Sequence, residues 1–152
     1  MTLKYELEGA GWATATLYTQ QGSASMAVSY LHDSLRELTE AALLLCKGID
    51  EAEVSLVNEP GAHRLVFKRG AYDVVNVELQ RYATWPAVAR QPDEVILRVE
   101  TTVARVRHQV LSVLWRIHQG YGADGYMEAW GKHGFPQAEY ERLEAIKIGH
   151  SM

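Results

Sequence analysis

The first part of the chain alternates between apolar and polar residues with the period of a β-strand. Leu3, Tyr5 and Leu7 alternate with charged residues, which predicts a strand with one solvent-facing side. Two further strands are expected over residues 12–19 and 24–28, each after a short turn. Because the connections are so short, the three strands are expected to pair as an antiparallel meander.

A helical spacing replaces this alternation after residue 29. The apolar residues that share one side of the predicted helix are Leu31, Leu35, Leu38, Ala42 and Leu45. Ser29 is predicted to be the N-cap, and Asp33 lies in the first turn, where the helix dipole favours a carboxylate. Lys47 and Gly48 are typical of a helix end.

Strand patterns return in the middle of the chain. The expected strands cover residues 52–57, 63–69, 72–79 and 94–100. Residues 58–61, Asn-Glu-Pro-Gly, fit a type II turn between the first two. The segment at residue 94 has an alternative as a helix that begins at Pro92, but its β-branched residues favour a strand.

The last third is predicted to be helical. Thr101 or Thr102 caps a long helix, which we expect to end at Gly120 and Gly122. A short helical segment around residues 126–132 and a final helix follow. This order of elements predicts an α+β fold, in which an antiparallel sheet of about six or seven strands carries one central helix and two to three C-terminal helices.

Composition agrees with one cytosolic domain over residues 1–152. Apolar residues make up 47% of the chain and charged residues 22%, which are ordinary globular values. The single cysteine, Cys46, excludes an internal disulfide and gives no indication of secretion. The N-terminal residues lack the apolar stretch of a signal peptide, and no apolar run is long enough for a membrane span. We therefore expect a cytoplasmic location and no membrane partner.

Charge is unevenly distributed along the chain. Residues 1–60 hold three Lys or Arg against nine Asp or Glu, whereas residues 61–119 hold nine against five. The net charge of −4 argues against nucleic acid as a partner, since nucleic-acid binders usually carry a basic excess. Either the folded surface has separate acidic and basic faces, which would steer a charged partner, or the two signs intermix.

No motif for catalysis, cofactor binding or metal binding is recognisable. The histidines lack the spacing of a metal site, and the glycines at 120, 122 and 125 follow a helix rather than a strand, unlike a dinucleotide-binding loop. Glu59 and His63 flank a turn and are candidates for an acid–base pair. In the alternative, Glu59 is simply a turn residue and His63 a strand-edge residue. We expect no enzyme activity, no cofactor and no metal.

One side of the long helix combines residue types that are frequent in interfaces. Arg105, His108, Ser112 and Arg116 fall in a narrow stripe opposite the apolar side, and Trp115 borders it. Trp and Arg are enriched at binding hot spots, so this stripe is a candidate contact surface. The alternative is a solvated helix face with Trp115 packed against the sheet.

Three stretches together resemble a known class of proteins. They are residues 29–35, residues 58–61 with Arg64, and the aromatic stretch from Tyr121 to Pro136. In this pattern the chain resembles uncharacterised bacterial α+β proteins, some of which are immunity proteins encoded beside polymorphic or contact-dependent toxins. The resemblance implies a cytosolic protein that binds a cognate toxin and occludes its active site.

The candidate partner-binding residues follow from these charges and patterns. They are Glu51, Glu53, Glu59, His63, Arg64, Arg105, His108, Trp115 and Arg116. Glu51 and Glu53 are candidates to mimic the substrate phosphates of a nucleic-acid-targeting toxin.

A different class of function stays open beside this one. A small-ligand carrier or small enzyme would use an apolar cavity between the sheet and the long helix. Tyr18, His63 and Arg64 would then be its polar contacts.

Overall fold

The computed structural model describes residues 1–86, 91–131 and 133–146. These segments contain two antiparallel sheets and three helices, so the predicted α+β class is confirmed. The prediction of one sheet of six or seven strands is wrong, because the seven strands form a sheet of three and a sheet of four. The seven strands divide because α1 (Ser34–Cys46) separates the third strand from the fourth, and those two strands pack together without pairing.

The first sheet consists of β1 (Thr2–Gly9), β2 (Trp12–Thr19) and β3 (Gly22–Ser29) in sequence order. As the alternation predicts, Leu3, Tyr5 and Leu7 are buried while the residues between them are exposed. The antiparallel meander is confirmed, and β1 forms one edge of this sheet.

The second sheet is also an antiparallel meander in sequence order. Its strands are β4 (Glu51–Asn58), β5 (Gly61–Arg69), β6 (Val74–Tyr82) and β7 (Glu94–Thr102). The predicted strand at residue 94 is thus confirmed and its helical alternative is wrong. The predicted type II turn is wrong as well, because the Glu59–Pro60 peptide bond is cis, which is typical of a type VI turn.

One helix boundary differs from the predictions, and one predicted boundary is a break within α2. Ser29 pairs with Trp12 in the sheet, so it cannot cap α1, and Asp33 is the N-cap. Of the two predicted caps, Thr102 is the one that caps α2 (Val103–Trp130). α2 consists of two helical parts, because the backbone of Gly122 is not helical (φ 69°, ψ 175°) and breaks the helix where its end was predicted. The second part ends at Trp130, in the region where a short helical segment was predicted.

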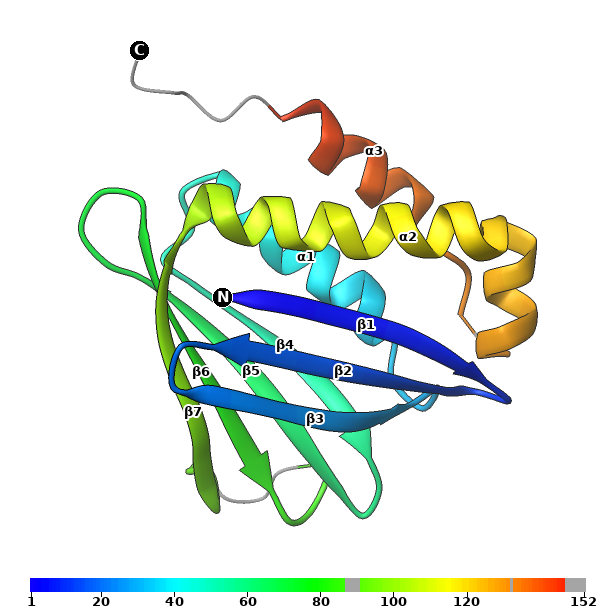
Figure 1. The fold of residues 1–152 in the computed structure, drawn as a ribbon, viewed down its shortest axis with the longest axis horizontal. Helices are drawn as coiled ribbons and strands as arrows, with labels where there is room; N and C mark the ends of the chain where they lie inside the picture. The colour runs from blue at the N-terminus through cyan, green and yellow to red at the C-terminus, as the bar shows by residue number, and fades with distance from the viewer. Residues whose placement is uncertain (87–90, 132, 147–152) are drawn as a thin grey trace.

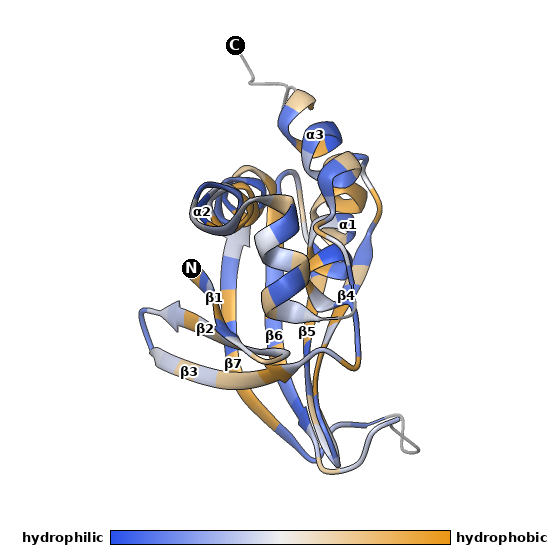
Figure 2. Cartoon of the chain, turned by 90° about the vertical axis from the view of Figure 1, so that its right-hand side faces the viewer, coloured by the Kyte–Doolittle hydropathy of each residue, from blue (hydrophilic) through white to orange (hydrophobic). Residues whose placement is uncertain are grey.

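The helices lie on one side of the two sheets. Figure 1 shows α2 running along β1, with α1 behind it and α3 (Gln137–Ala145) beyond it. The view in Figure 2 shows the two sheets inclined to each other. Buried apolar residues from both sheets and all three helices form one core cluster. In this arrangement β3 packs on the second sheet, while β1, at the opposite edge of its sheet, lies against α2.

Candidate functional site

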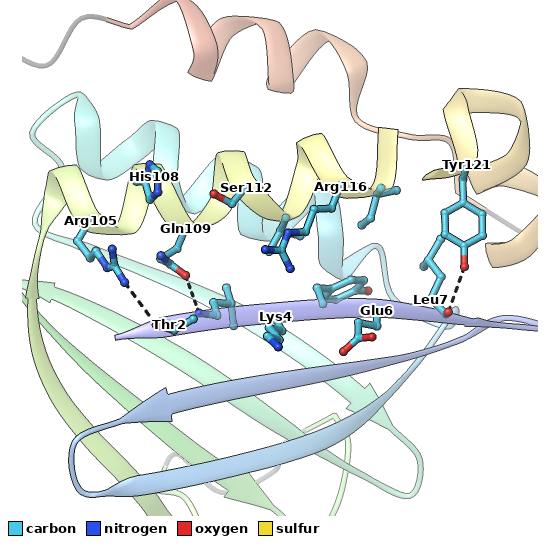
Figure 3. A pocket seen from close by; sticks show the side chains of 14 residues that line it. Thr2, Lys4, Glu6, Leu7, Arg105, His108, Gln109, Ser112, Arg116 and Tyr121 are labelled. Carbon is cyan, nitrogen blue, oxygen red and sulfur yellow. Dashed lines mark hydrogen bonds between the residues drawn. The ribbon is translucent and has the colours of Figure 1, made fainter. Parts of the chain in front are cut away.

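A groove runs between the outer edge of β1 and the long helix α2. Its volume is about 550 Å³, and Figure 3 shows the side chains that line it. The lining residues are Thr2, Leu3, Lys4, Tyr5, Glu6, Leu7, Arg105, His108, Gln109, Ser112, Val113, Arg116, Ile117 and Tyr121. We call this feature the β1–α2 groove.

Side chains of α2 bind the backbone of β1 at both ends of the groove. Gln109 Oε1 accepts the Leu3 N–H at 2.8 Å, and the Tyr121 hydroxyl donates to the Leu7 carbonyl at 3.3 Å. Arg105 Nε donates to the carbonyl of Met1 at 3.0 Å. An edge strand leaves backbone groups without a neighbouring strand, so α2 supplies the partners that a strand would otherwise provide.

The backbone of Tyr5 faces the middle of this groove. In an antiparallel pair, every second residue points both its N–H and its C=O away from the neighbouring strand. Leu3 and Leu7 point theirs toward α2, so Tyr5, midway between them, does the same. No residue that the structure describes bonds to the N–H or the C=O of Tyr5 on that side.

Cations outnumber anions in the groove. Its lining includes three cations, Lys4, Arg105 and Arg116, and a single carboxylate, Glu6. Figure 3 shows Arg116 pointing from α2 toward β1, between the contacts of Gln109 and Tyr121. The groove is therefore a locally positive site on a chain whose net charge is −4.

Arg116 is distinguished from the other arginines that the structure describes by having no polar partner. The others each have an ion pair or a hydrogen bond: Arg36, Arg64, Arg69, Arg81, Arg98, Arg105, Arg107 and Arg142. The Arg116 side chain is exposed and its guanidinium is free to bind an external group.

A second hollow, of about 360 Å³, lies between α2 and α3. Trp115 lines it together with Tyr140 and Glu144. The alternative in which Trp115 packs against the sheet is wrong, because 56% of this residue is exposed.

The two hollows share His108, Ser112 and Arg116, so they adjoin across the exposed side of α2. The predicted stripe is thereby brought into one continuous surface. We call it the α2 face; it consists of Arg105, His108, Ser112, Trp115 and Arg116.

The predicted acidic residues lie elsewhere, on and next to β4. Glu51, Glu53 and Glu59 are exposed, and none of them lines either hollow beside α2. Glu53 contacts the guanidinium of Arg64 at 3.6 Å, so its charge is partly committed within the fold.

The predicted polar contacts of a small ligand do not come together. Tyr18 is exposed and carries Lys4 over its ring, whereas Arg64 stacks against the rings of Tyr82 and Trp85 on the second sheet. None of Tyr18, His63 and Arg64 lines the groove.

The acid–base pair that the sequence allowed is not formed either. His63 pairs with Leu56 across the ladder and has no ion pair with Glu59 in the described part of the chain. Burial, reinforced by the nearby Arg81, lowers the pKa of His63 and favours its neutral form.

A buried polar cluster around Asp33 has no counterpart in the sequence analysis. It brings together polar atoms that have no hydrogen-bond partner within the described residues: Tyr5 hydroxyl, Asp33 Oδ1, Tyr126 hydroxyl, Trp130 Nε1 and His133 Nε2. These residues belong to β1, the N-cap of α1, the second part of α2 and the segment after it, so no local sequence pattern predicts that they lie together. Burial raises the pKa of Tyr5 and of Tyr126, and the Asp33 carboxylate adds to both shifts.

The described residues include no group of three or more His, Cys, Asp or Glu placed to hold a metal ion. Cys46 is half-buried, and this burial raises the pKa of its thiol, which keeps the thiol protonated at neutral pH.

Comparison of the chain with protein-family models, curated protein sequences and solved structures gives no significant match. None of the helices in the described segments has both the length and the apolar character needed to cross a membrane.

Proposed function

We propose that this chain is a non-enzymatic protein-binding module and that the α2 face is its contact surface. The observation that carries the proposal is the pairing of Trp115, which is 56% exposed, with the neighbouring Arg116, which has no polar partner among the described residues. Tryptophan and arginine are the residue types that most often dominate binding energy.

The surroundings of these two residues support a protein partner. The hollows on either side of the α2 face offer places for partner side chains, and hot spots are typically seated in such depressions. The face is also basic on its β1 side, which favours an acidic partner through electrostatic complementarity.

For the partner itself we propose a cognate bacterial toxin, bound in the cytoplasm so that its active site is occluded. This identity rests on the resemblance of residues 29–35, 58–61 and 121–136 to proteins of which some are immunity proteins. Glu51, Glu53 and Glu59 offer a second, acidic surface, which would suit a toxin that acts on nucleic acid.

The test of the contact surface compares variants in one retention experiment. Immobilised wild-type chain, a Trp115→Ala/Arg116→Ala double variant and a Trp12→Ala/Arg98→Ala control are exposed to lysate of the source organism. The control removes an exposed tryptophan and an exposed arginine that lie outside both hollows.

We expect a protein that is retained by the wild-type chain and the control and is lost from the double variant. Each hot-spot truncation should weaken binding by about 2 kcal/mol, or about thirtyfold, when affinity is measured by calorimetry. If the same protein is instead lost from a Glu51→Gln/Glu53→Gln/Glu59→Gln variant, the contact lies on the acidic surface and not on the α2 face. Co-expression with the retained protein then tests neutralisation, since a toxin should arrest growth only when the chain is absent or carries the double change.

A small-ligand carrier is the second candidate, and the β1–α2 groove favours it. Its volume of about 550 Å³ falls within the usual range of ligand pockets, about 300–1,000 Å³. A metabolite that raises the melting temperature of the wild-type chain, but not that of an Arg116→Ala variant, would support this function over the first.

A further inference from the structure

The middle of the β1–α2 groove combines two unpartnered groups that bind anions. The Tyr5 N–H points toward α2 by strand alternation, and the Arg116 guanidinium points back toward β1. A backbone N–H and an arginine are both typical partners of carboxylate oxygens, and arginine binds them in a planar, two-pronged geometry.

An added β-strand would not fit in this place. Gln109 reaches the Leu3 backbone directly, with 2.8 Å between the bonded atoms, so the backbone of α2 lies only one side chain away from β1. A strand paired with β1 would have to lie about 4.8 Å from it, within the space that α2 and its side chains occupy. The groove thus admits a side chain from outside rather than a length of backbone.

The dimensions of the groove favour a protein as the source of that side chain. The stretch of α2 from Arg105 to Tyr121 spans about 24 Å at the rise of an α-helix. Trp115 continues the same surface beyond the groove. This length suits a protein surface better than a single small metabolite.

We propose that the β1–α2 groove binds the carboxylate of an acidic side chain on the partner protein, with the Arg116 guanidinium and the Tyr5 N–H as its donors. The inference rests on the proposed function, since it names the chemical group that the α2 face recognises. Glu6 is the anionic residue in the groove and opposes this binding, whereas Lys4 and Arg105 favour it.

The test uses two short blocked peptides as probes, acetyl-Gly-Glu-Gly-amide and its glutamine counterpart. Each is titrated into the full chain labelled with ¹⁵N, and the amide signals of β1 are followed by NMR. We expect the glutamate peptide to shift the Tyr5 amide and to bind about tenfold more tightly than the glutamine peptide, because a charged acceptor forms the stronger hydrogen bonds.

Variants of exposed residues then locate the site. Arg116→Ala should weaken binding of the glutamate peptide about tenfold, and Glu6→Gln should strengthen it about twofold. Glu8→Gln is the matched control, since Glu8 is an exposed carboxylate on the same strand but does not line the groove. Equal binding of the two peptides, or an unchanged affinity in Arg116→Ala, would overturn the proposal.

Glutarate is the third probe, because a free dicarboxylate carries the same group without a peptide. Tighter binding of glutarate than of the glutamate peptide would overturn the assignment to a protein side chain. The peptide result is independent of the retention experiment. If the partner is lost from the Trp115/Arg116 double variant but Arg116→Ala alone leaves its binding unaffected, this inference is removed, and the α2 face remains the contact surface through Trp115 alone. If the groove binds the glutamate peptide specifically but the double variant still retains the partner, the α2 face is not the contact surface and carboxylate binding in the groove still stands.

Discussion

Replacing Gln109 by methionine isolates one hydrogen bond between the helix and the edge strand. Gln109 is only 6% exposed, and its Oε1 accepts the buried Leu3 N–H. Methionine keeps the length of the side chain and an equal helix propensity, so packing changes little. The Leu3 N–H is then left without its acceptor, and an unpaired buried donor costs about 1–3 kcal/mol.

For a chain of this size, 1 kcal/mol corresponds to about 2–4 °C in melting temperature. Gln109→Met should therefore lower the melting temperature by about 2–12 °C in thermal unfolding followed by circular dichroism. The matched control is Gln119→Met, which makes the same exchange at an exposed position of the same helix. Hydrogen exchange adds a local readout, since the Leu3 amide should lose protection in the first variant only.

Equal melting temperatures of the two variants, together with an unchanged exchange rate at Leu3, would refute this reasoning. They would mean that the Leu3 N–H does not depend on Gln109 and that α2 holds β1 by apolar contacts alone.

Three further changes test contacts within the fold. Tyr126→Phe removes a buried hydroxyl that has no partner among the described residues, so it should raise the free energy of unfolding, measured in urea, by about 1 kcal/mol. A lower free energy of unfolding in the variant would show that this hydroxyl is stabilising. The protonated His32 ring donates a hydrogen bond to the Glu37 carboxylate, and this bond raises the pKa of His32. The stability advantage of the wild-type chain over His32→Asn should therefore be greatest below about pH 6.5 and should vanish as the pH rises past the raised pKa, as measured by urea unfolding across pH. A Cβ on Gly11 would lie 2.6 Å from the ring of Tyr30, whereas a Cβ on Gly9, which has a similar positive φ, would meet open space. Gly11→Ala should therefore melt several degrees below Gly9→Ala. Equal melting temperatures would show that the positive φ alone sets the loss of stability.

Local patterns predicted most of the elements of this fold. The alternation at Leu3, Tyr5 and Leu7 predicts β1 and its buried side. The sequence narrows the cap of α2 to Thr101 or Thr102, and in the structure Thr102 accepts the Arg105 N–H. Helical spacing also placed Arg105 and Arg116 on one side of α2, which is why the basic half of the groove was predictable.

Features that depend on distant segments were not predictable in this way. Gln109 and Leu3 are bonded across 106 positions of sequence, so no short pattern shows that β1 forms the other wall of the groove. The division into two sheets has the same origin, since strand periodicity fixes the faces of β3 and β4 but not whether they pair. The break of α2 at Gly122 was predictable locally, because a glycine with positive φ normally terminates a helix, but no local pattern shows that the second part packs into the core through Trp130.

The hydrogen bonds from α2 to β1 also bear on solubility. A bare strand edge is a template on which other chains can add strands and aggregate. Here Arg105, Gln109 and Tyr121 occupy the ends of that edge, and the helix itself blocks the approach of a further strand. Substitutions that loosen α2 should therefore make the chain prone to self-association at temperatures where most of its structure is still intact, so that turbidity would precede the loss of circular dichroism.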